Sequence, residues 1–262
     1  MSHLSIIIVS FNARTDLLAC LRSPRDAPPA IDHEVIVVDN GSSDGSVEAA
    51  GTIDGVRVLP LGRNAGFAAA NNAGIRESRG DLLLLLNSDT IVPRGAIDLL
   101  VERFHAVGNV GVAGPRLVDG AGRPELSFGR MISPLNEFLQ QRRTRAWIEA
   151  QTAQEQPVDW VSGACLLVSR RDAEAVGLLD ERFFLYTEDV DFCHAIRSLG
   201  RRVLFTPAAE IVHLRGRSRA VRPAESQAAY RRSHLAFYQK HHPWFVPFLR
   251  LYVRLKGERL DQ

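Results

Sequence analysis

Two groups of acidic and amide side chains follow apolar runs, at points where a strand would end. A run of five leucines precedes Asn87, Ser88 and Asp89. A valine-rich run precedes Asp39. Such oxygens suit a hard cation such as Mg²⁺, which binds one or two carboxylates together with substrate phosphates. Asp89 also lies four residues before Pro93, so capping of a following helix is the structural alternative.

A second acidic cluster contains Glu188, Asp189 and Asp191 and follows an aromatic segment, residues 183–186. Apolar surroundings raise the pKa of a carboxylate, and a general base needs a raised pKa. The cluster therefore predicts a catalytic base. The structural alternative is an acidic helix N-terminus, which the helix dipole favours.

The segment VHLRGRS, residues 212–218, places His213 close to Arg215 and Arg217. Guanidinium groups suit phosphate oxygens, and a neutral imidazole suits a metal site shared with Asp89. A single histidine after a strand is more often structural, so this segment alone does not decide between the two roles.

Two glycine-containing segments partly match the motifs of serine hydrolases and of nucleotide-binding loops. GSSDG, residues 41–45, matches the G-x-S-x-G elbow of hydrolases, and Ser43, Asp189 and His213 follow the hydrolase order. However, Asp39 is poorly suited to the strand before such an elbow, and the sequence has no HGGG-type oxyanion loop. A serine hydrolase is therefore kept only as an alternative. GRNAGF, residues 62–67, is not G-x-G-x-x-G, and the sequence has neither a dinucleotide-binding turn nor a Walker A loop.

Strands and helices alternate through the first 115 residues, which predicts βαβ units and a mostly parallel sheet. Helices are expected after the first four strands, one from about Ser43 and another opened by Pro93. In such sheets, ligands bind beyond the carboxyl ends of the strands. The polar residues at 10–12, 39–40 and 87–89 are therefore expected to line one edge. The expected strands are 4–12, 35–38, 56–61, 82–86 and 109–115.

The second half is expected to begin with a lid or insertion over 119–156, which includes the basic stretch QQRRTR. A strand and a helix are expected within 158–177, and a helix from about Glu188. A strand at 201–207, a strand and polar loop at 210–218, and further helices complete the chain. The sequence has no internal repeat or low-complexity linker, which favours a single domain.

The composition excludes several classes of protein. The 262 residues carry 32 Lys+Arg and 30 Asp+Glu, a net charge of +2 that is too balanced to indicate nucleic-acid binding. Three cysteines without C-x-x-C spacing argue against a disulfide framework or a zinc site and favour a reducing compartment. The sequence shows no signal peptide and no run of ~20 apolar residues, so a cytoplasmic location is expected.

Several segments together resemble the family 2 glycosyltransferases, inverting enzymes of GT-A type fold that use nucleotide-sugars. These segments are IIIVSFN, VIVVDNGSSDGS, GRNAGFAAANNAG, LLLLLNSDT, WVSGACLLVSRR, GLLDERFFLYTEDVDFC and HLRGRS, in this order up to about residue 218. The chain is most similar to the bacterial rhamnosyltransferase-type members, which often use dTDP-L-rhamnose. The resemblance implies an α/β fold with a mostly parallel, Rossmann-like central sheet flanked by helices and followed by a C-terminal helical tail.

The resemblance also implies the reacting groups. Asp189 would be the catalytic base, and Asp89 and His213 would bind a divalent metal, Mg²⁺ or Mn²⁺. Asn87 stands where the family's D-x-D motif has its first acid, which leaves the strictness of metal dependence open.

Binding residues follow from the same resemblance. Trp160, Gly163 and Glu188 would line the acceptor side. The nucleotide-sugar would be held by Phe11, Asn12, Asp39, Arg63, Asn64, Asn72, Asn87, Ser88 and Arg215.

The expected reaction is one inverting displacement from a dTDP-sugar or UDP-sugar to a hydroxyl of a glycan or lipid-linked acceptor. The alternative is a nucleotide-sugar-binding protein without transfer activity. The catalytic domain would span 1–218, with a nucleotide-sugar half at 1–115 and an acceptor half at 116–218. A helical extension would span 219–262.

Residues 243–256 of this extension predict a partner. Phe248, Leu251, Tyr252 and Leu255 share one helical face, and basic residues lie elsewhere on the helix. Such a helix suits an anionic membrane surface, here the inner face of the plasma membrane. Packing against the domain or against a second subunit of a homodimer is an equally open alternative.

Overall fold

The protein is described here from a computed structural model, which describes residues 3–134, 136, 144–214 and 223–255. Its first half contains the expected alternation of strands and helices, and the four strands are parallel in the order β3-β2-β1-β4. The elements are β1 (Leu4–Ser10), α1 (Arg14–Asp26), β2 (His33–Asp39), α2 (Ser46–Gly51), β3 (Val56–Pro60), α3 (Phe67–Glu77) and β4 (Leu82–Asn87).

The sheet continues from β4 through β11, β6 and β12 to β5. It is mixed, because β11 is antiparallel to both β4 and β6. The elements of this half are β5 (Thr90–Ile91), α4 (Ala96–Ala106), β6 (Val110–Val118), β7 (Pro124–Glu125), β8 (Phe128–Gly129), α6 (Arg145–Gln151), β9 (Gln156–Val158), β10 (Trp160–Val161), β11 (Cys165–Ser169), α7 (Arg170–Ala175), α8 (Glu188–Ser198) and β12 (Arg202–His213).

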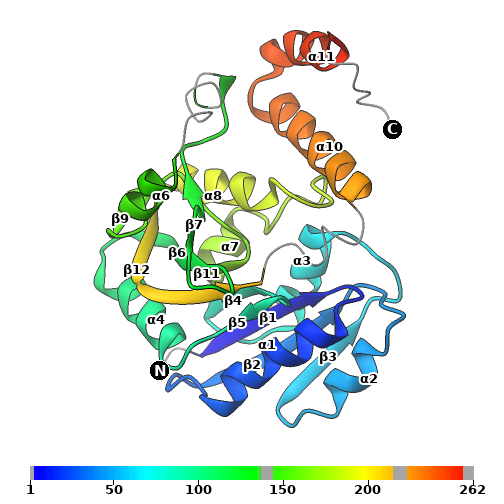
Figure 1. The fold of residues 1–262 in the computed structure, drawn as a ribbon, viewed down its shortest axis with the longest axis vertical. Helices are drawn as coiled ribbons and strands as arrows, with labels where there is room; N and C mark the ends of the chain where they lie inside the picture. The colour runs from blue at the N-terminus through cyan, green and yellow to red at the C-terminus, as the bar shows by residue number, and fades with distance from the viewer. Residues whose placement is uncertain (1–2, 135, 137–143, 215–222, 256–262) are drawn as a thin grey trace.

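The five leucines of β4 are explained by burial on both faces of the sheet. Leu82, Leu84 and Leu86 pack in the cluster that includes α1 and α4. Leu83 and Leu85 belong to the cluster that includes α3, α7 and α8. Because successive strand residues point to opposite faces, a strand covered on both sides requires apolar residues without alternation. The helices therefore form layers on the two faces of the sheet (Figure 1).

Several expected boundaries differ from the observed ones. α2 begins at Ser46 rather than near Ser43, and α4 begins at Ala96, after Gly95 in the left-handed conformation, rather than at Pro93. The two strands expected at 201–207 and 210–218 are one strand, β12, with a register shift between Thr206 and Glu210. A bulge of this kind lets one strand continue past an irregular stretch.

The segment 119–156, expected to be a lid or insertion, pairs with the sheet near both of its ends. β7 pairs with β6, and β9 pairs with β12. Residues 135 and 137–143, which include much of the QQRRTR stretch, lie outside the described residues.

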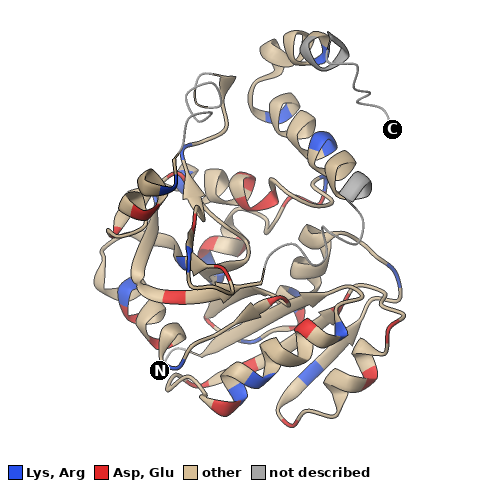
Figure 2. Ribbon diagram, viewed as in Figure 1, with Lys and Arg blue, Asp and Glu red and all other residues tan. Residues whose placement is uncertain are grey.

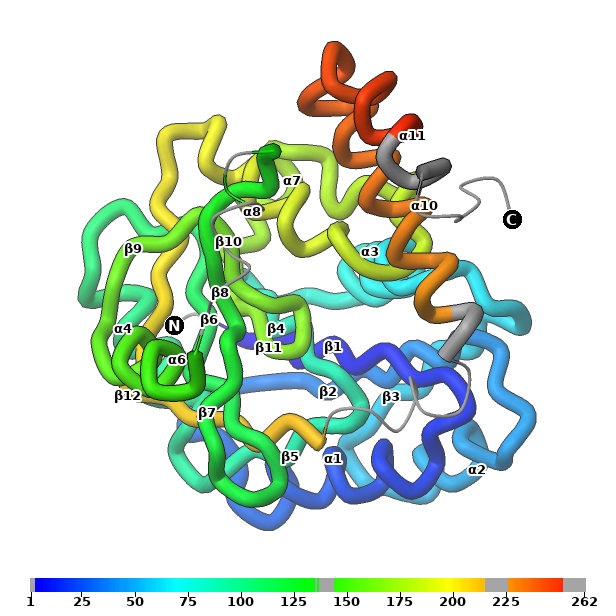
Figure 3. The backbone as a smooth tube through the Cα atoms, turned by 45° about the horizontal axis from the view of Figure 1, so that its top comes forward, coloured from blue at the N-terminus to red at the C-terminus, as the bar shows by residue number. Residues whose placement is uncertain are grey.

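The chain ends in α10 (Pro223–His241), the short 3-10 helix η1 (Pro243–Phe245) and α11 (Val246–Leu255). α10 lies beside the segment that leads into α8, and α11 lies at the far end of the molecule (Figures 1 and 3). Among the residues that the structure describes, no helix is long and apolar enough to cross a membrane.

Three free cysteines, Cys20, Cys165 and Cys193, are buried in the two core clusters. Burial raises the pKa of the Cys20 and Cys193 thiols to about 12. The pKa of Cys165 is raised by burial as well. All three are therefore protonated and unreactive at neutral pH.

Candidate active site

Three strands bring polar residues to one edge of the sheet, as the sequence predicts. In the parallel register, Ser10 of β1 pairs with Asp39 of β2, and Val9 pairs with Asn87 of β4. The loops that follow these strands therefore begin side by side at the carboxyl edge, where ligands bind in open α/β sheets.

Asp39 organises the first of these loops. Its Oδ2 accepts hydrogen bonds from the N–H groups of Gly41 at 3.1 Å and Ser42 at 2.9 Å. The residue is only 2% exposed, and its Oδ1 is buried without a hydrogen-bond partner among the described residues. A buried carboxylate oxygen left in this state requires an explanation, and a donor group of a bound ligand would satisfy it.

Asn12 joins the loop after β1 to the loop after β2. Its Oδ1 accepts hydrogen bonds from Ser43 N–H at 2.8 Å and from the Ser43 hydroxyl at 3.4 Å. Its own N–H donates to Ser42 Oγ at 2.8 Å. Phe11, half-buried, directly precedes Asn12. The Ser43 hydroxyl thus donates to an amide oxygen, and the two ring nitrogens of His213 lie beside Asp89 and Glu125, which does not favour the alternative triad of Ser43, Asp189 and His213.

Arg63 and Asn64 lie exposed at the same edge. Gly41, at φ +82°, approaches the Arg63 backbone so closely that an added Cβ would lie 2.7 Å from it. Asn64 Oδ1 accepts a hydrogen bond from Asn40 Nδ2 at 2.9 Å, and Asn40 Oδ1 accepts the Ala65 N–H at 2.8 Å. Asn40 was expected at this edge together with Asp39 but was given no role of its own, and these hydrogen bonds supply one.

Asn72 has a structural role in this structure, which differs from its predicted contact with a nucleotide. It is 1% exposed. Its Nδ2 donates to Leu179 O at 2.8 Å and to Glu181 Oε1 at 2.9 Å, and its Oδ1 accepts the Leu179 N–H at 3.0 Å. Because its amide is committed to these partners, Asn72 positions the loop before the acidic cluster.

Asp89 and His213 lie together, as predicted for a shared metal site. The Nε2 of His213 is 3.3 Å from Asp89 Oδ1, and the Leu214 N–H donates to the Asp89 carbonyl at 2.8 Å. On the other side of the ring, Nδ1 lies 3.5 Å from Glu125 Oε2. Glu125 was missed, because nothing in its sequence context separates it from a surface glutamate.

The residues near Asp89 offer oxygen and nitrogen donors to a cation. Asn87 Oδ1 is buried without a hydrogen-bond partner among the described residues, and Ser88 is half-buried beside it. No group of three or more His, Cys, Asp or Glu side chains in the described part of the chain is placed to hold a metal. A cation here would therefore need oxygens from its substrate as well. Arg215 lies outside the described residues.

Asp189 reaches the same edge of the sheet from α8. Its Oδ2 accepts the Gly163 N–H at 2.8 Å, and its Oδ1 accepts the Val190 N–H at 2.8 Å. The residue after Gly163 is tied to β4, because Ala164 O accepts the Asn87 N–H at 3.0 Å. The loop between β10 and β11 thus connects the surroundings of Asp189 directly to the end of β4, which leads to Asp89.

Glu188, next to Asp189, is 5% exposed, and its Oε2 has no hydrogen-bond partner among the described residues. Burial, reinforced by the negative charge of Asp189, raises the pKa of Glu188 well above its usual value. This shift favours the protonated form of the side chain, which can donate a hydrogen bond.

The loop before α8 has an unusual backbone. Tyr186 and Thr187 have φ values of 70° and 74°, and Thr187 is the N-cap of α8. Left-handed conformations of non-glycine residues cost about 1–3 kcal/mol each and persist where surrounding contacts enforce them. The third predicted acceptor residue, Trp160, packs over Gly129 and donates from Nε1 to Arg130 O at 2.9 Å.

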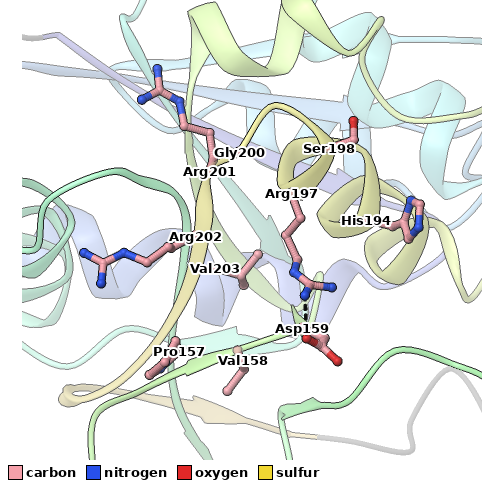
Figure 4. A pocket seen from close by; sticks show the side chains of 10 residues that line it. All are labelled: Pro157, Val158, Asp159, His194, Arg197, Ser198, Gly200, Arg201, Arg202 and Val203. Atoms are coloured by element: carbon pink, nitrogen blue, oxygen red, sulfur yellow. Dashed lines mark ion pairs between the residues drawn. The ribbon is translucent and has the colours of Figure 1, made fainter.

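A hollow of about 520 Å³ lies elsewhere, beside the C-terminal half of α8 and the strands β9 and β12 (Figure 4). Its polar lining includes His194 and the ion pair between Arg197 and Asp159 at 2.9 Å. Arg201 and Arg202 extend away from Arg197 in Figure 4. The hollow contains none of the predicted site residues.

Comparison with known proteins identifies the family and the fold. A family model described as Glycosyl transferase family 2 matches residues 5–175. The chain is 33% identical over 243 residues to an N-acetylglucosaminyl-diphospho-decaprenol L-rhamnosyltransferase of Mycobacterium tuberculosis, with 84% of this chain and 79% of that protein covered. It is 27% identical over 201 residues to the low-salt glycan biosynthesis hexosyltransferase Agl10 of Haloferax volcanii, with 75% and 62% covered.

Solved structures share the fold at low sequence identity. The mannosyltransferase PcManGT of Pyrobaculum calidifontis, in complex with GDP-Man and Mn²⁺, has a TM-score of 0.62 at 18% identity over 94% of this chain and 68% of that chain. GalNAc-T7 with UDP, GalNAc and Mn²⁺ has a TM-score of 0.61 at 18% identity. The match covers 81% of this chain but only 44% of the GalNAc-T7 chain. These likenesses confirm the expected GT-A type fold. By the match of the family model and the identity to the mycobacterial enzyme, the chain belongs to glycosyl transferase family 2 and is a glycosyltransferase.

Proposed function

We propose that this enzyme transfers a sugar, with inversion, from a nucleotide-sugar to a hydroxyl of a lipid-linked glycan, using Asp189 as base and a divalent metal at Asp89 and His213. The observation that carries the proposal is the loop between β10 and β11. Gly163 in this loop binds Asp189, and Ala164 binds the end of β4, two residues before Asp89. An acid suited to a metal and an acid suited to proton transfer thus lie at one edge of the sheet.

The base is prepared by its two backbone hydrogen bonds. The N–H groups of Gly163 and Val190 each donate to one carboxylate oxygen of Asp189, and together they fix the direction of the carboxylate. An acceptor hydroxyl approaching the remaining lone pairs can lose its proton to Asp189 as its oxygen attacks the anomeric carbon. The bond to the nucleoside diphosphate breaks in the same displacement, which inverts the anomeric configuration without a covalent enzyme intermediate.

The residues at the end of β4 fit a divalent cation. Asp89 supplies a carboxylate and His213 an imidazole nitrogen, and the unpartnered Oδ1 of Asn87 is a further oxygen in the same turn. When bound, the cation would supply positive charge that stabilises the departing diphosphate. Glu125 would orient the His213 ring from the Nδ1 side. A carboxylate facing Nδ1 favours the tautomer that carries its proton there, so that the Nε2 lone pair can bind the metal.

The donor and acceptor are proposed from the relatives. The mycobacterial relative is named for transfer of L-rhamnose to N-acetylglucosaminyl-diphospho-decaprenol. A relative from Pseudomonas aeruginosa, 29% identical over 207 residues, is named as an undecaprenyl-phosphate 4-deoxy-4-formamido-L-arabinose transferase. Both names describe acceptors attached to long prenyl chains. dTDP-L-rhamnose is therefore the leading donor and a prenyl-diphosphate-linked sugar the leading acceptor, with a UDP-sugar as the second choice of donor.

A lipid-linked acceptor requires access to a membrane surface, and we assign this role to η1 and α11. Trp244, Phe248 and Leu251 are 68%, 62% and 57% exposed. Arg250 is exposed beside them on α11, where Figure 2 shows a basic residue. Flotation with anionic vesicles tests this role: the full chain should float, and a chain ending at residue 242 should not. If neither floats, the membrane role is wrong. Elution of the full chain as a dimer would instead assign these side chains to a second copy.

The function itself is tested in two steps. Thermal-shift measurements with dTDP, UDP, GDP and their sugars identify the donor, since a ligand at 100 times its dissociation constant stabilises by about 2.7 kcal/mol. Transfer to a short-chain prenyl-diphosphate acceptor is then measured with Mn²⁺, with Mg²⁺ and with EDTA. We expect EDTA to abolish transfer. Donor binding without transfer under any condition would favour the alternative of a nucleotide-sugar-binding protein, for which the Asn87 substitution is the supporting observation.

A further inference from the structure

The segment from Asp180 to Asp191 carries the proposed base and has a backbone that needs external support. Tyr186 and Thr187 are both in the left-handed region, which is rare for two successive residues with side chains. Thr187 is β-branched, and its side chain makes no capping hydrogen bond to α8. Contacts from outside the segment must therefore hold this conformation.

The helix α10 supplies such contacts along the loop. The Ser233 hydroxyl, in a residue 3% exposed, donates to Leu185 O at 2.8 Å. Phe237, fully buried, packs with Phe183 and Val190, which lie on either side of the left-handed pair. α10 thus touches the loop before and after the left-handed pair, and the two segments follow neighbouring paths in Figures 1 and 3.

Ionic contacts connect the two ends of the segment through the same helix. Lys240 Nζ donates to Asp180 Oδ2 and to Asp191 Oδ2, both at 2.8 Å. His241 Nε2 lies 2.7 Å from the other oxygen of Asp191, a residue that is 2% exposed. Burial alone would lower the pKa of Lys240, but its hydrogen bonds to the two aspartates outweigh burial and raise the pKa, so the ammonium stays charged.

The geometry of α8 transmits these contacts to the base. Asp189 and Asp191 are two positions apart, about 200° around a helix with 3.6 residues per turn, so they lie on nearly opposite faces. Asp191 faces α10, and Asp189 faces the Gly163 loop. Fixing Asp191 therefore fixes the rotation of the first turn of α8 and, with it, the direction of Asp189.

We propose that α10 is a clamp that positions the base: Ser233 and Lys240 hold the Asp180–Asp191 segment so that Asp189 stays against Gly163. The effect on activity rests on the proposed function, whereas the effect on the loop does not. Both are positioning residues, since neither reaches the proposed reacting atoms.

Lys240→Met tests the clamp, with Lys240→Arg as the conservative variant and Arg232→Met, exposed on the same helix, as the control for loss of a positive charge. We expect kcat of Lys240→Met to fall at least tenfold, because small displacements of a reacting group cost about 10²-fold. The donor KM should change less than about twofold, since the substitution leaves the loops at the carboxyl edge of the sheet, where the nucleotide would bind, unchanged. Lys240→Arg should recover most of kcat, and Arg232→Met should match the wild type.

Amide hydrogen exchange of residues 185–189 provides the readout that is independent of activity. We expect exchange at least tenfold faster in Lys240→Met and unchanged in Arg232→Met. Native kcat and native exchange in a folded Lys240→Met would overturn the clamp. If Lys240→Met does not fold, Ser233→Ala, which removes one oxygen and keeps the ion pairs, is judged by the same two outcomes. A wild type that transfers no sugar would refute the proposed function, while the exchange result would still decide whether α10 holds the loop.

Discussion

Asp189→Asn is the substitution that examines the proposed reaction most directly. Both carboxylate oxygens accept a backbone N–H at 2.8 Å, Oδ2 from Gly163 and Oδ1 from Val190. Asparagine retains one acceptor oxygen and presents an NH₂ group at the other position. In either orientation of the amide, one backbone N–H faces another N–H.

The substitution therefore has two effects of different size. Leaving one donor unsatisfied costs about 1–3 kcal/mol of local stability. Removing a general base lowers the rate by about 10²–10⁴-fold, which corresponds to roughly 2.7–5.4 kcal/mol of transition-state stabilisation. We expect the kinetic effect to exceed the structural one, so that kcat falls by about 10²–10⁴-fold in a protein that remains folded.

Single-turnover transfer with saturating acceptor measures the chemical step, and calorimetry measures donor affinity. The donor dissociation constant should stay within about twofold, because Asp189 acts on the acceptor. Glu102→Gln, which replaces an exposed carboxylate of α4 by an amide, is the matched control. Turnover by Asp189→Asn within about threefold of the wild type would remove Asp189 from the role of base. A donor affinity that falls as much as kcat/KM would show that Asp189 binds the donor instead.

Three further substitutions address neighbouring residues. Asn72→Ala should lower the free energy of unfolding in urea by about 1–3 kcal/mol, because it leaves the Leu179 N–H unsatisfied, without changing nucleotide affinity; a large loss of affinity would restore its predicted nucleotide contact. Glu125→Gln should weaken Mn²⁺ binding, followed by electron paramagnetic resonance, about 10–100-fold, and unchanged binding would contradict an orienting role toward His213. The raised pKa of Glu188 means that its contribution to stability is present below its unfolded pKa and is lost as pH rises toward the raised folded value. Glu188→Gln should therefore lose less stability than the wild type as pH rises above about 4.5, and parallel curves in pH-dependent denaturation would exclude this.

Elements whose own residues form one uninterrupted pattern could be predicted from the sequence. The leucine run of β4 has the composition of a strand buried on both faces, and the structure confirms it. The start of α8 at Glu188 was also predicted, as was the gathering of the polar strand ends at one edge. The adjacency of Asp89 and His213 followed from the resemblance to the family, and the structure brings the two side chains together.

Features that depend on distant partners could not be predicted. Asp191 reads as one more acid at a helix N-terminus until Lys240 and His241, some fifty positions later, are placed against it. The spacing of residues in the helix of Asn72 does not indicate that its side chain binds Leu179, which lies far away in the sequence. The apolar run of β12 is interrupted by Pro207 and two alanines, so local hydropathy divides what pairing with β6 keeps as one strand.

The three thiols of the core have a practical consequence for studying this enzyme. Since all of them are shielded from solvent and remain in the S–H form, maleimide and methanethiosulfonate reagents should leave the native chain unmodified. A single cysteine introduced at an exposed position of α10, such as Gln239, would then be the one site of labelling. Labelling of native thiols would therefore not interfere with fluorescent or spin-label probes attached to the C-terminal helices.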